Sequence, residues 1–423
     1  MPTINLSAKR YILLFILIIL IYPVIAQPVM QTGGKMPDEW IDKDTHHKVV
    51  RLSRIPGTSL SFYFHNNPFV GNRMVFYNSS NQQGGEATDM KRQESYVLNS
   101  KNRQLYALDL GSLKAEQLTQ HPLAMSGEIV SEKLKEAFFQ VKDSVFAVNV
   151  VTKKERLVYV FPADFQASIT TINADGTLLG GSKGTDAEKE IYKNHPQKSE
   201  YFNLIFEAKL PKTLFTVDIK TGKLNKIFTD SAWLNHVQFS CTDPAILMFC
   251  HEGPWHKVDR IWTIDVNTKK VALMHARTMP MEIAGHEWIG ASGKTIWFDL
   301  QQPRGSTFFV AGADARTGNE VHKYQLQQNE WSVHYNSSPD EKLFAGDGGD
   351  PGAVAKAPDG QWIYLFTPDG DHFKSEKLVN MKQHQYKLEP NVHFSPDSKW
   401  IIFRANFEGT ENVYAVEIAK SSK

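Results

Sequence analysis

Cysteine is nearly absent from this chain of 423 residues, which contains Cys241 and Cys250 alone. The two flank a short apolar segment at 245–249, and their spacing is not that of a metal-binding knuckle. A chain of this length buries a large core without cross-links. We therefore expect two free buried thiols, keep a disulfide between them as the alternative, and predict no catalytic cysteine.

The chain also lacks an excess of charge of either sign. Lys and Arg together number 47 and Asp and Glu number 46, so the formal net charge is +1. No basic stripe with interleaved aromatic residues occurs, and we predict no nucleic-acid surface and no general attraction to anionic membranes. An anionic ligand must then be held by a local cluster of Arg, Lys, His or metal.

Long hydrophobic runs are missing, apart from one at the N-terminus. Lys9 and Arg10 precede an apolar run at 11–22, and Pro23 and a small-residue end at 24–26 follow it. This order is typical of a signal peptide, whereas a membrane-spanning helix needs about 20 apolar residues. We predict a signal peptide at 1–26 and an exported protein, periplasmic or secreted, with an uncleaved membrane anchor as the alternative.

Sustained helical periodicity is lacking as well, and an internal repeat of roughly 50 residues takes its place. One half of the repeat is a strand that ends in an acidic or amide residue before a turn. Its copies lie at 105–109, 145–149, 214–218, 261–265 and 413–417. The other half is a strand, a turn such as Ser-Pro-Asp at 338–340 or 395–397, and a second strand.

Two such hairpins per repeat give four antiparallel strands, which form one blade of a propeller. Counting both halves gives seven repeats, with six or eight as alternative counts. The sequence therefore predicts an all-β fold, a seven-bladed β-propeller of four-stranded antiparallel blades. We expect residues 27–420 to form this single domain.

Histidine recurs at one position of the repeat, four residues before the turn that ends the first strand, as His236, His286 and His334. Asn391 occupies this position in the last repeat, with His393 two residues on, and His65 lies close to it in the first. In a propeller these side chains should converge at one mouth of the channel. One histidine there is usually a hydrogen-bonded channel residue, whereas several indicate imidazole chemistry. Three imidazoles with an amide oxygen suit Mn, Fe, Zn or Ni.

A second polar cluster lies at 249–262, in a loop between two expected strands. His251, Glu252 and Arg260 could turn towards the same mouth, and arginine is the natural bidentate partner of a carboxylate. The alternative is structural, with Arg260 paired to Asp259 or Glu252 and the tryptophans filling the blade.

Several segments resemble those of oligogalacturonate lyases. They lie at 40–45, 50–54, 63–67, 236–244, 249–262, 334–336, 344–348 and 388–393. The His-Glu-Gly-Pro-Trp motif at 251–255 and the Val-Asp-Arg-Ile-Trp motif at 258–262 are specific, whereas Ser-Pro-Asp turns are generic to propellers. The resemblance spans about 40–419 and implies a propeller that cleaves short pectic oligosaccharides by β-elimination with a divalent metal, typically Mn²⁺.

The resemblance also implies roles for individual residues. The family holds its metal by three histidines and a glutamine and uses a separate histidine as base. By motif, the catalytic residues are His286 as the base with Arg260 and His251, and the substrate-binding residues are His236, His65 and Tyr335. The expected metal ligands are His334, Asn391, His393 and Gln385, with Gln383 or Gln238 as alternatives for the amide.

Three departures from the family pattern stand out. Leu388 stands near the expected glutamine, Asn391 stands where a histidine is expected, and the leader contrasts with a family that is commonly cytoplasmic. A degenerate homologue that binds acidic sugars without turnover is therefore one alternative. A non-enzymatic periplasmic propeller of the translocation type, binding protein or peptide, is another. A propeller that gates a serine peptidase is disfavoured, because no residues remain for a hydrolase domain.

Overall fold

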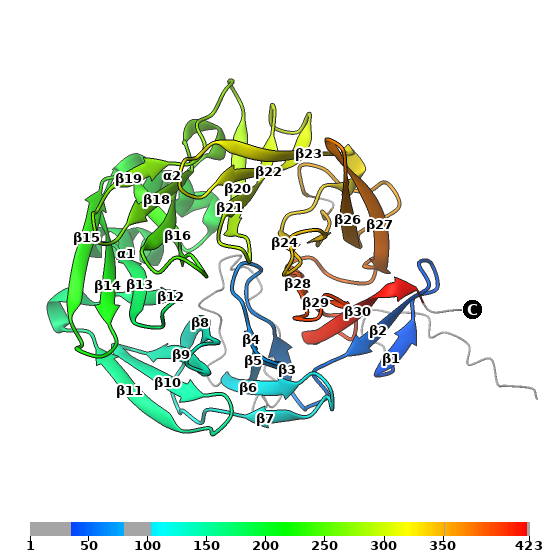
Figure 1. Cartoon of the computed structure of the whole chain (residues 1–423), viewed down its shortest axis with the longest axis horizontal. Helices are drawn as coiled ribbons and strands as arrows, with labels where there is room; N and C mark the ends of the chain where they lie inside the picture. The colour runs from blue at the N-terminus through cyan, green and yellow to red at the C-terminus, as the bar shows by residue number, and fades with distance from the viewer. Residues whose placement is uncertain (1–34, 80–102, 351, 421–423) are drawn as a thin grey trace, which may run out of the picture.

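The computed structural model describes residues 35–79, 103–350 and 352–420, which form a ring of antiparallel β-sheets (Figure 1). These residues confirm the predicted all-β fold, with sheets of four or more strands. The predicted signal peptide at 1–26 lies outside the described residues. Within them, no helix combines the length and the apolar character needed to cross a membrane.

Three sheets each consist of four consecutive strands. The first contains β8 (Ser126–Ser131), β9 (Glu136–Val141), β10 (Ser144–Asn149) and β11 (Glu155–Val160). The second contains β12 (Ser168–Ile172), β13 (Leu178–Lys183), β14 (Lys212–Asp218) and β15 (Leu224–Asp230). The third contains β16 (Trp233–Phe239), β17 (Ile246–Glu252), β18 (Ile261–Asp265) and β19 (Val271–Leu273).

The next eight strands form two units of four. One unit contains β20 (Ile283–Ile289), β21 (Thr295–Gln301), β22 (Phe308–Asp314) and β23 (Glu320–Leu326). The other contains β24 (Tyr335–Ser337), β25 (Phe344–Gly346), β26 (Trp362–Asp369) and β27 (His372–Asn380). A single parallel pair, Gln325 with His372, joins the units into one eight-stranded sheet.

The two ends of the chain share the sheet that closes the ring. It contains β1 (Glu39–Ile41), β2 (His47–Arg51), β28 (His393–Phe394), β29 (Trp400–Ala405) and β30 (Asn412–Lys420), and β2 pairs with β30. The neighbouring sheet contains β3 (Thr58–Leu60), β4 (Phe69–Val70), β5 (Arg73–Ser79), β6 (Gln104–Asp109) and β7 (Ala115–Gln117).

Apolar side chains fill the space between neighbouring sheets. In one cluster, Met248 and Ile261 of the β16–β19 sheet lie with Ile296, Phe298 and Ala311 of the next unit. Alternation along each strand supplies such side chains to both faces, because successive residues point in opposite directions. The packing holds neighbouring sheets, and hence their inner strands, at fixed positions.

Two helices, α1 (Asp186–Asn194) and α2 (Lys198–Ala208), interrupt the sheet between β13 and β14, and the sequence analysis did not predict them. Thr185 caps α1 by accepting a hydrogen bond from the backbone N–H of Glu188. Tyr201 and Ile205 of α2 are buried against Trp233 of β16. This small apolar contact fixes α2 beside the strand that carries His236.

The two cysteines are both free. Cys250 is buried in β17, as expected, whereas Cys241 is exposed at the turn that follows β16. The expectation of two buried thiols is right for Cys250 and wrong for Cys241, and the alternative disulfide is not formed.

Candidate active site

Four histidines from different parts of the ring lie near one another, as the repeat alignment predicts. The ring centroids of His286 and His334 are 4.9 Å apart, and those of His65 and His236 are 6.1 Å apart. The ring of Tyr63 lies between the two pairs, at 5.2 Å from His334 and 6.2 Å from His236. We refer to His65, His236, His286 and His334 as the histidine cluster.

A shared backbone feature turns the strand histidines. The pairing register shifts where β16 passes His236 and where β20 passes His286, and these residues have φ of 48° and 49°. Asn391 has φ of 50° at the matching position of the last repeat. Positive φ is uncommon outside glycine, but histidine and asparagine adopt it more often than most residues. Bulges of this kind re-aim a side chain, so these strands present their polar residues in a common way.

The loop at 61–68, which joins β3 to β4, reaches towards the centre of the ring (Figure 1). The backbone N–H of Phe64 donates to Oδ1 of Asn391 at 3.0 Å, and its carbonyl accepts from Nδ2 of Asn336 at 2.8 Å. The backbone N–H of Tyr63 donates to Glu128 at 2.6 Å. Contacts with several sheets therefore hold this loop and place His65 in the cluster.

Arg260 lies in a buried network rather than at an open surface. Its Nη1 donates to Oε1 of Glu252 at 2.6 Å and its Nε donates to Oε2 of Glu287 at 2.9 Å, with 1% of its side chain exposed. Burial by itself raises the pKa of Glu252, but Arg260 and His236 outweigh it and hold that pKa at about 2. The pairing with Glu252, given above as the structural alternative for Arg260, is present, and Glu287 adds a second partner.

His236 faces both carboxylates of this network. Its Nδ1 lies 3.3 Å from Oε1 of Glu287, and its Nε2 lies 3.8 Å from Oε2 of Glu252. Burial is the largest influence and lowers the pKa of His236, while the two glutamates oppose that shift. The sequence placed His236 at the site but gave no sign of its partner Glu287.

His286 and His334 touch but differ in their surroundings. Burial, followed by the nearby His334, lowers the pKa of His286 well below its usual value, and Nδ1 of His286 is buried without a hydrogen-bond partner. Burial acts the same way on His334, but Asp347 and Glu389 outweigh it and raise the pKa of His334. The two adjacent imidazoles therefore favour different protonation states.

Two predicted site residues, His251 and Tyr335, have aromatic neighbours outside the histidine cluster, at Trp262 and Phe366. His251 stacks on Trp262 of the adjacent strand at 4.7 Å, because successive residues of β17 point to opposite faces and Glu252 takes the face towards His236. Tyr335 is fully buried, and its hydroxyl accepts from the backbone N–H of Ser332 at 2.8 Å. The roles expected for these two residues therefore stay predictions, without a contact to the cluster that supports them among the residues that the structure describes.

Three of the four predicted metal ligands bind other groups of the protein. His334 fits the chemistry, since Asp347 holds its Nδ1 at 2.8 Å and its Nε2 remains 3.3 Å from the hydroxyl of Tyr63. Oδ1 of Asn391 is already bonded to Phe64. Nε2 of His393 faces the carbonyls of Tyr63 and Asn66 at 3.2 and 3.1 Å.

Gln385 is exposed, and Leu388 is packed in an apolar cluster near the expected glutamine position. In the described part of the chain, no three His, Cys, Asp or Glu side chains meet in a metal-binding arrangement. Within the predicted set, Nδ1 of His393 is buried without a hydrogen-bond partner among the described residues and is able to take a metal, whereas Oδ1 of Asn391 is bonded and Gln385 is exposed.

A Gly-x-Ser-x-Gly pattern occurs at 180–184, which bears on the serine peptidase alternative. Ser182 lies within β13 and pairs with Ser168 and Leu214 of the adjacent strands. A nucleophile elbow instead places its serine on a sharp turn between a strand and a helix. The pattern therefore gives that alternative no support.

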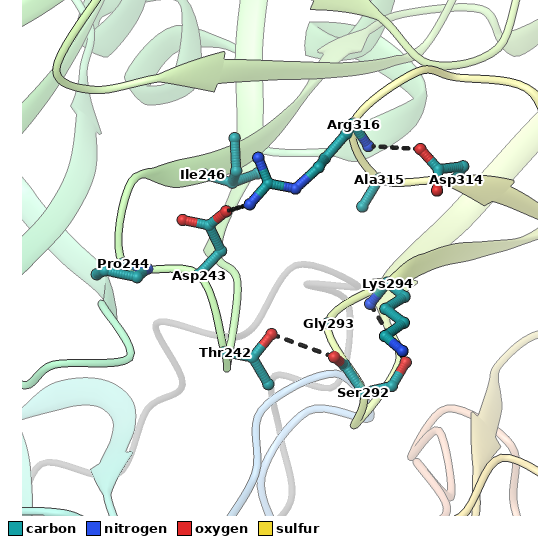
Figure 2. Close-up of a pocket in the computed structure, with 10 residues that line it drawn as sticks. All are labelled: Thr242, Asp243, Pro244, Ile246, Ser292, Gly293, Lys294, Asp314, Ala315 and Arg316. Atoms are coloured by element: carbon teal, nitrogen blue, oxygen red, sulfur yellow. Dashed lines mark hydrogen bonds and ion pairs between the residues drawn. The ribbon is translucent and has the colours of Figure 1, made fainter.

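A cavity of 570 Å³ lies at the turns that follow β16, β20 and β22. Figure 2 shows Arg316 bonded to Asp243 across it, and Thr242 donating to the carbonyl of Ser292. No predicted site residue lines this cavity. The candidate chemistry therefore lies at the histidine cluster and not in the cavity.

A ring of four-stranded antiparallel sheets with imidazoles gathered beside its inner strands defines a propeller-like protein with a histidine-rich site. Residues 98–422 match the family model described as oligogalacturonate lyase, and the chain belongs to this family. Oligogalacturonate lyase of Dickeya dadantii (strain 3937) is 27% identical over 341 residues, covering 75% of this chain and 83% of the relative. Oligogalacturonide lyase of Pectobacterium atrosepticum is 26% identical over 340 residues, with the same coverage.

Solved structures share the fold. An oligogalacturonate lyase from Vibrio parahaemolyticus superimposes with a TM-score of 0.73 at 21% identity, covering 91% of this chain and 97% of that chain. An oligogalacturonate lyase solved in complex with manganese superimposes with a TM-score of 0.74 at 22% identity, covering 92% of this chain and 99% of that chain.

Proposed function

We propose that this protein is an oligogalacturonate lyase that cleaves short pectic oligosaccharides by β-elimination and leaves a 4,5-unsaturated sugar. Membership of the family supports the reaction. The observation that carries it is the histidine cluster, in which the rings of His286 and His334 lie 4.9 Å apart beside His65 and His236.

The reaction begins at C5 of galacturonate, next to the C6 carboxylate. Removing the C5 proton builds further negative charge on that group, so cations or hydrogen-bond donors must stabilise the transition state. The C4–O4 bond then breaks and a C4=C5 double bond forms. Because no water is consumed, the paired carboxylates of a glycosidase are not required.

His286 is the proposed base. A neutral imidazole accepts a proton at neutral pH, and Nδ1 of His286 is not committed to another group. His334, oriented by Asp347, supplies a cationic donor beside it for the carboxylate of the sugar. The tryptophan Trp255 lies edge-on to His286 at 4.9 Å and forms an apolar wall next to the base.

A divalent metal, Mn²⁺, is the proposed cofactor, and the relative solved in complex with manganese supports it. Among the predicted ligands, His393 would contribute its Nδ1 atom, which is buried without a hydrogen-bond partner in the part of the chain that the structure describes, whereas Oδ1 of Asn391 is bonded to the loop at 61–68. The steps above therefore use this chain's own side chains.

The same proposal covers the organisation of the chain. We infer seven blades, counting the eight-stranded sheet as two, because a single residue pair joins its halves. Residues 27–420 form the lyase domain, and the leader at 1–26 directs export. The partner is an acidic oligosaccharide, and no nucleic-acid contact is proposed.

Incubation with digalacturonate tests the proposal. The purified protein, with and without added Mn²⁺, should raise ultraviolet absorbance as the conjugated double bond forms. Binding of the sugar without any absorbance change would instead support the degenerate-homologue alternative. Absence of both binding and turnover would overturn the lyase assignment.

A further inference from the structure

We propose that His236 delivers a proton to the departing O4 oxygen, and that Glu287, Glu252 and Arg260 position its ring for this step. The inference rests on the proposed β-elimination and adds a second proton-transferring residue to it. Three observations support it, namely the stereochemistry of the substrate, the carboxylates around His236, and the contrast with His286.

The substrate requires two separate groups. In galacturonate the C5 hydrogen and the O4 oxygen lie on opposite faces of the ring, so a base at C5 cannot also reach O4. The electrons of the C5–H bond form the double bond, and those of the C4–O4 bond leave with O4. The base gains the C5 proton and O4 takes one from a second group, after which both exchange with solvent.

Both ring nitrogens of His236 face a carboxylate. Oε1 of Glu287 lies 3.3 Å from Nδ1, and Oε2 of Glu252 lies 3.8 Å from Nε2. A neutral imidazole has one lone pair, which would point at one of the two anions. The protonated ring has an N–H on each side: the Nδ1–H pairs with Glu287, and the Nε2–H, which lies beyond hydrogen-bond distance of Glu252, is the proton given to O4.

The fold gives the Oε1 atom of Glu287 no hydrogen-bond partner among the described residues. The side chain is fully buried, and neither Oε1 nor Nδ1 of His236 has a hydrogen-bond partner elsewhere in the described residues. A buried carboxylate oxygen without a partner is costly, unless a proton on His236 completes the pair.

Arg260 fixes the spacing of the two carboxylates. Its Nη1 and Nε each hold one glutamate, and Trp255 adds a bond from Nε1 to Oε1 of Glu252 at 3.3 Å. The guanidinium also lies 5.3 Å from the ring of Trp255. Because Trp255 lies against His286 as well, one buried network sets the positions of both imidazoles.

The charged groups around His236 come from several elements. Glu287 of β20 and Glu252 of β17 raise its pKa, whereas burial, Arg260 and Lys198 of α2 lower it. The ring of His65 is a further neighbour at 6.1 Å. A bound galacturonate brings an additional negative charge and shifts the balance towards the protonated form.

His286 provides the contrast within the same pair of sheets. It occupies the matching position and backbone conformation, but no carboxylate holds its ring. Burial lowers the pKa of both imidazoles, but among the described residues carboxylates oppose that shift at His236 alone, so of the two rings His236 is better able to hold a proton. His236 is thus suited to give a proton and His286 to accept one.

The leaving group provides the decisive experiment. We would compare digalacturonate with a galacturonate that carries a 4-nitrophenyl ether at C4, whose phenolate leaves without protonation. His236→Ala should lower kcat on digalacturonate by about 10² to 10⁴-fold and kcat on the aryl substrate by far less. His286→Ala should impair both substrates.

Equal losses on both substrates in His236→Ala would overturn the acid role. Inactivity of the wild-type protein on both substrates would instead overturn the lyase assignment, so the two failures are distinguishable. Circular dichroism melts of each variant separate loss of chemistry from loss of fold.

Glu287→Gln tests the positioning role. The variant keeps the shape of the side chain but removes the charge facing His236, so the alkaline limb of the kcat/KM profile should move to lower pH. Glu282→Gln is the matched control, because Glu282 is also buried and holds another histidine, His275, at 2.7 Å. Coincident pH profiles for the two variants would overturn the role of Glu287.

Discussion

Asp347 holds His334 through both of its carboxylate oxygens. Oδ2 lies 2.8 Å from Nδ1 of the ring, and Oδ1 accepts the backbone N–H of His334 at 2.9 Å. The hydroxyl of Tyr386 also donates to Oδ1 at 3.0 Å. One buried carboxylate therefore fixes both the main chain and the side chain of this histidine.

Loss of that carboxylate should reduce activity. We expect Asp347→Asn to lower kcat/KM on digalacturonate by about 10 to 100-fold, because His334 loses the group that orients its ring. Initial rates measured by ultraviolet absorbance check this. An Asp347→Asn protein with normal rates would show that the contact serves stability alone.

The base assignment makes a separate prediction. His286→Ala should abolish detectable release of the unsaturated product, since no other cluster imidazole lies at its position. His372→Ala is the control, because His372 is exposed on β27 and should keep wild-type rates. Near-normal activity of the His286 variant would remove this residue from the base role.

Metal binding should respond to two substitutions at the predicted ligand positions. We expect Leu388→Gln combined with Asn391→His to bind Mn²⁺ at least about tenfold more tightly than the wild-type chain, because it adds two donors of the kind that manganese accepts. Histidine should be tolerated at 391, since His236 and His286 adopt the same positive φ.

Equilibrium dialysis with quantified manganese measures this difference without relying on turnover. Gln385→Ala should leave the affinity unchanged, because Gln385 is exposed. Equal affinity of the double variant and the wild-type chain would refute the inference that these positions limit metal binding.

Asp299 should make stability depend on pH. Burial raises its pKa from 3.8 to about 7, against the hydrogen bonds from Trp331 and Gln301. The folded state therefore favours the neutral acid, and this contribution to stability is complete below about pH 4 and lost as the pH rises to about 7.

Asp299→Asn cannot ionise, so the variant should lose less stability than the wild-type chain between pH 5 and pH 8. Urea unfolding at the two pH values gives the free energies to compare. A parallel pH dependence in both proteins would show that Asp299 is ionised in the fold.

Local signals predicted the fold well. The copies expected at 145–149, 214–218 and 261–265 lie within β10, β14 and β18, because hairpins depend on turn residues and alternation that are visible within a few positions. The two helices were missed because they form a short insertion whose apolar residues meet Trp233, a contact outside their own segment.

The site was less accessible to sequence reasoning. The shared repeat position found His236, His286 and His334, but pairing of charges across sheets left no local trace. Glu287 follows His286 directly and yet faces His236 on β16 of the neighbouring sheet, because the bulge in β20 changes which face each residue takes. Only the packed arrangement reveals such a partner.

The pairing of β2 with β30 brings the two ends of the described chain together, and this affects when the histidine cluster can form during synthesis. His65 follows the first of these strands, and the loop at 61–68 binds Asn391 and His393, so it meets these two anchors only after the last repeat has begun. A nascent or C-terminally clipped chain would hold most of its sheets and still lack a working centre.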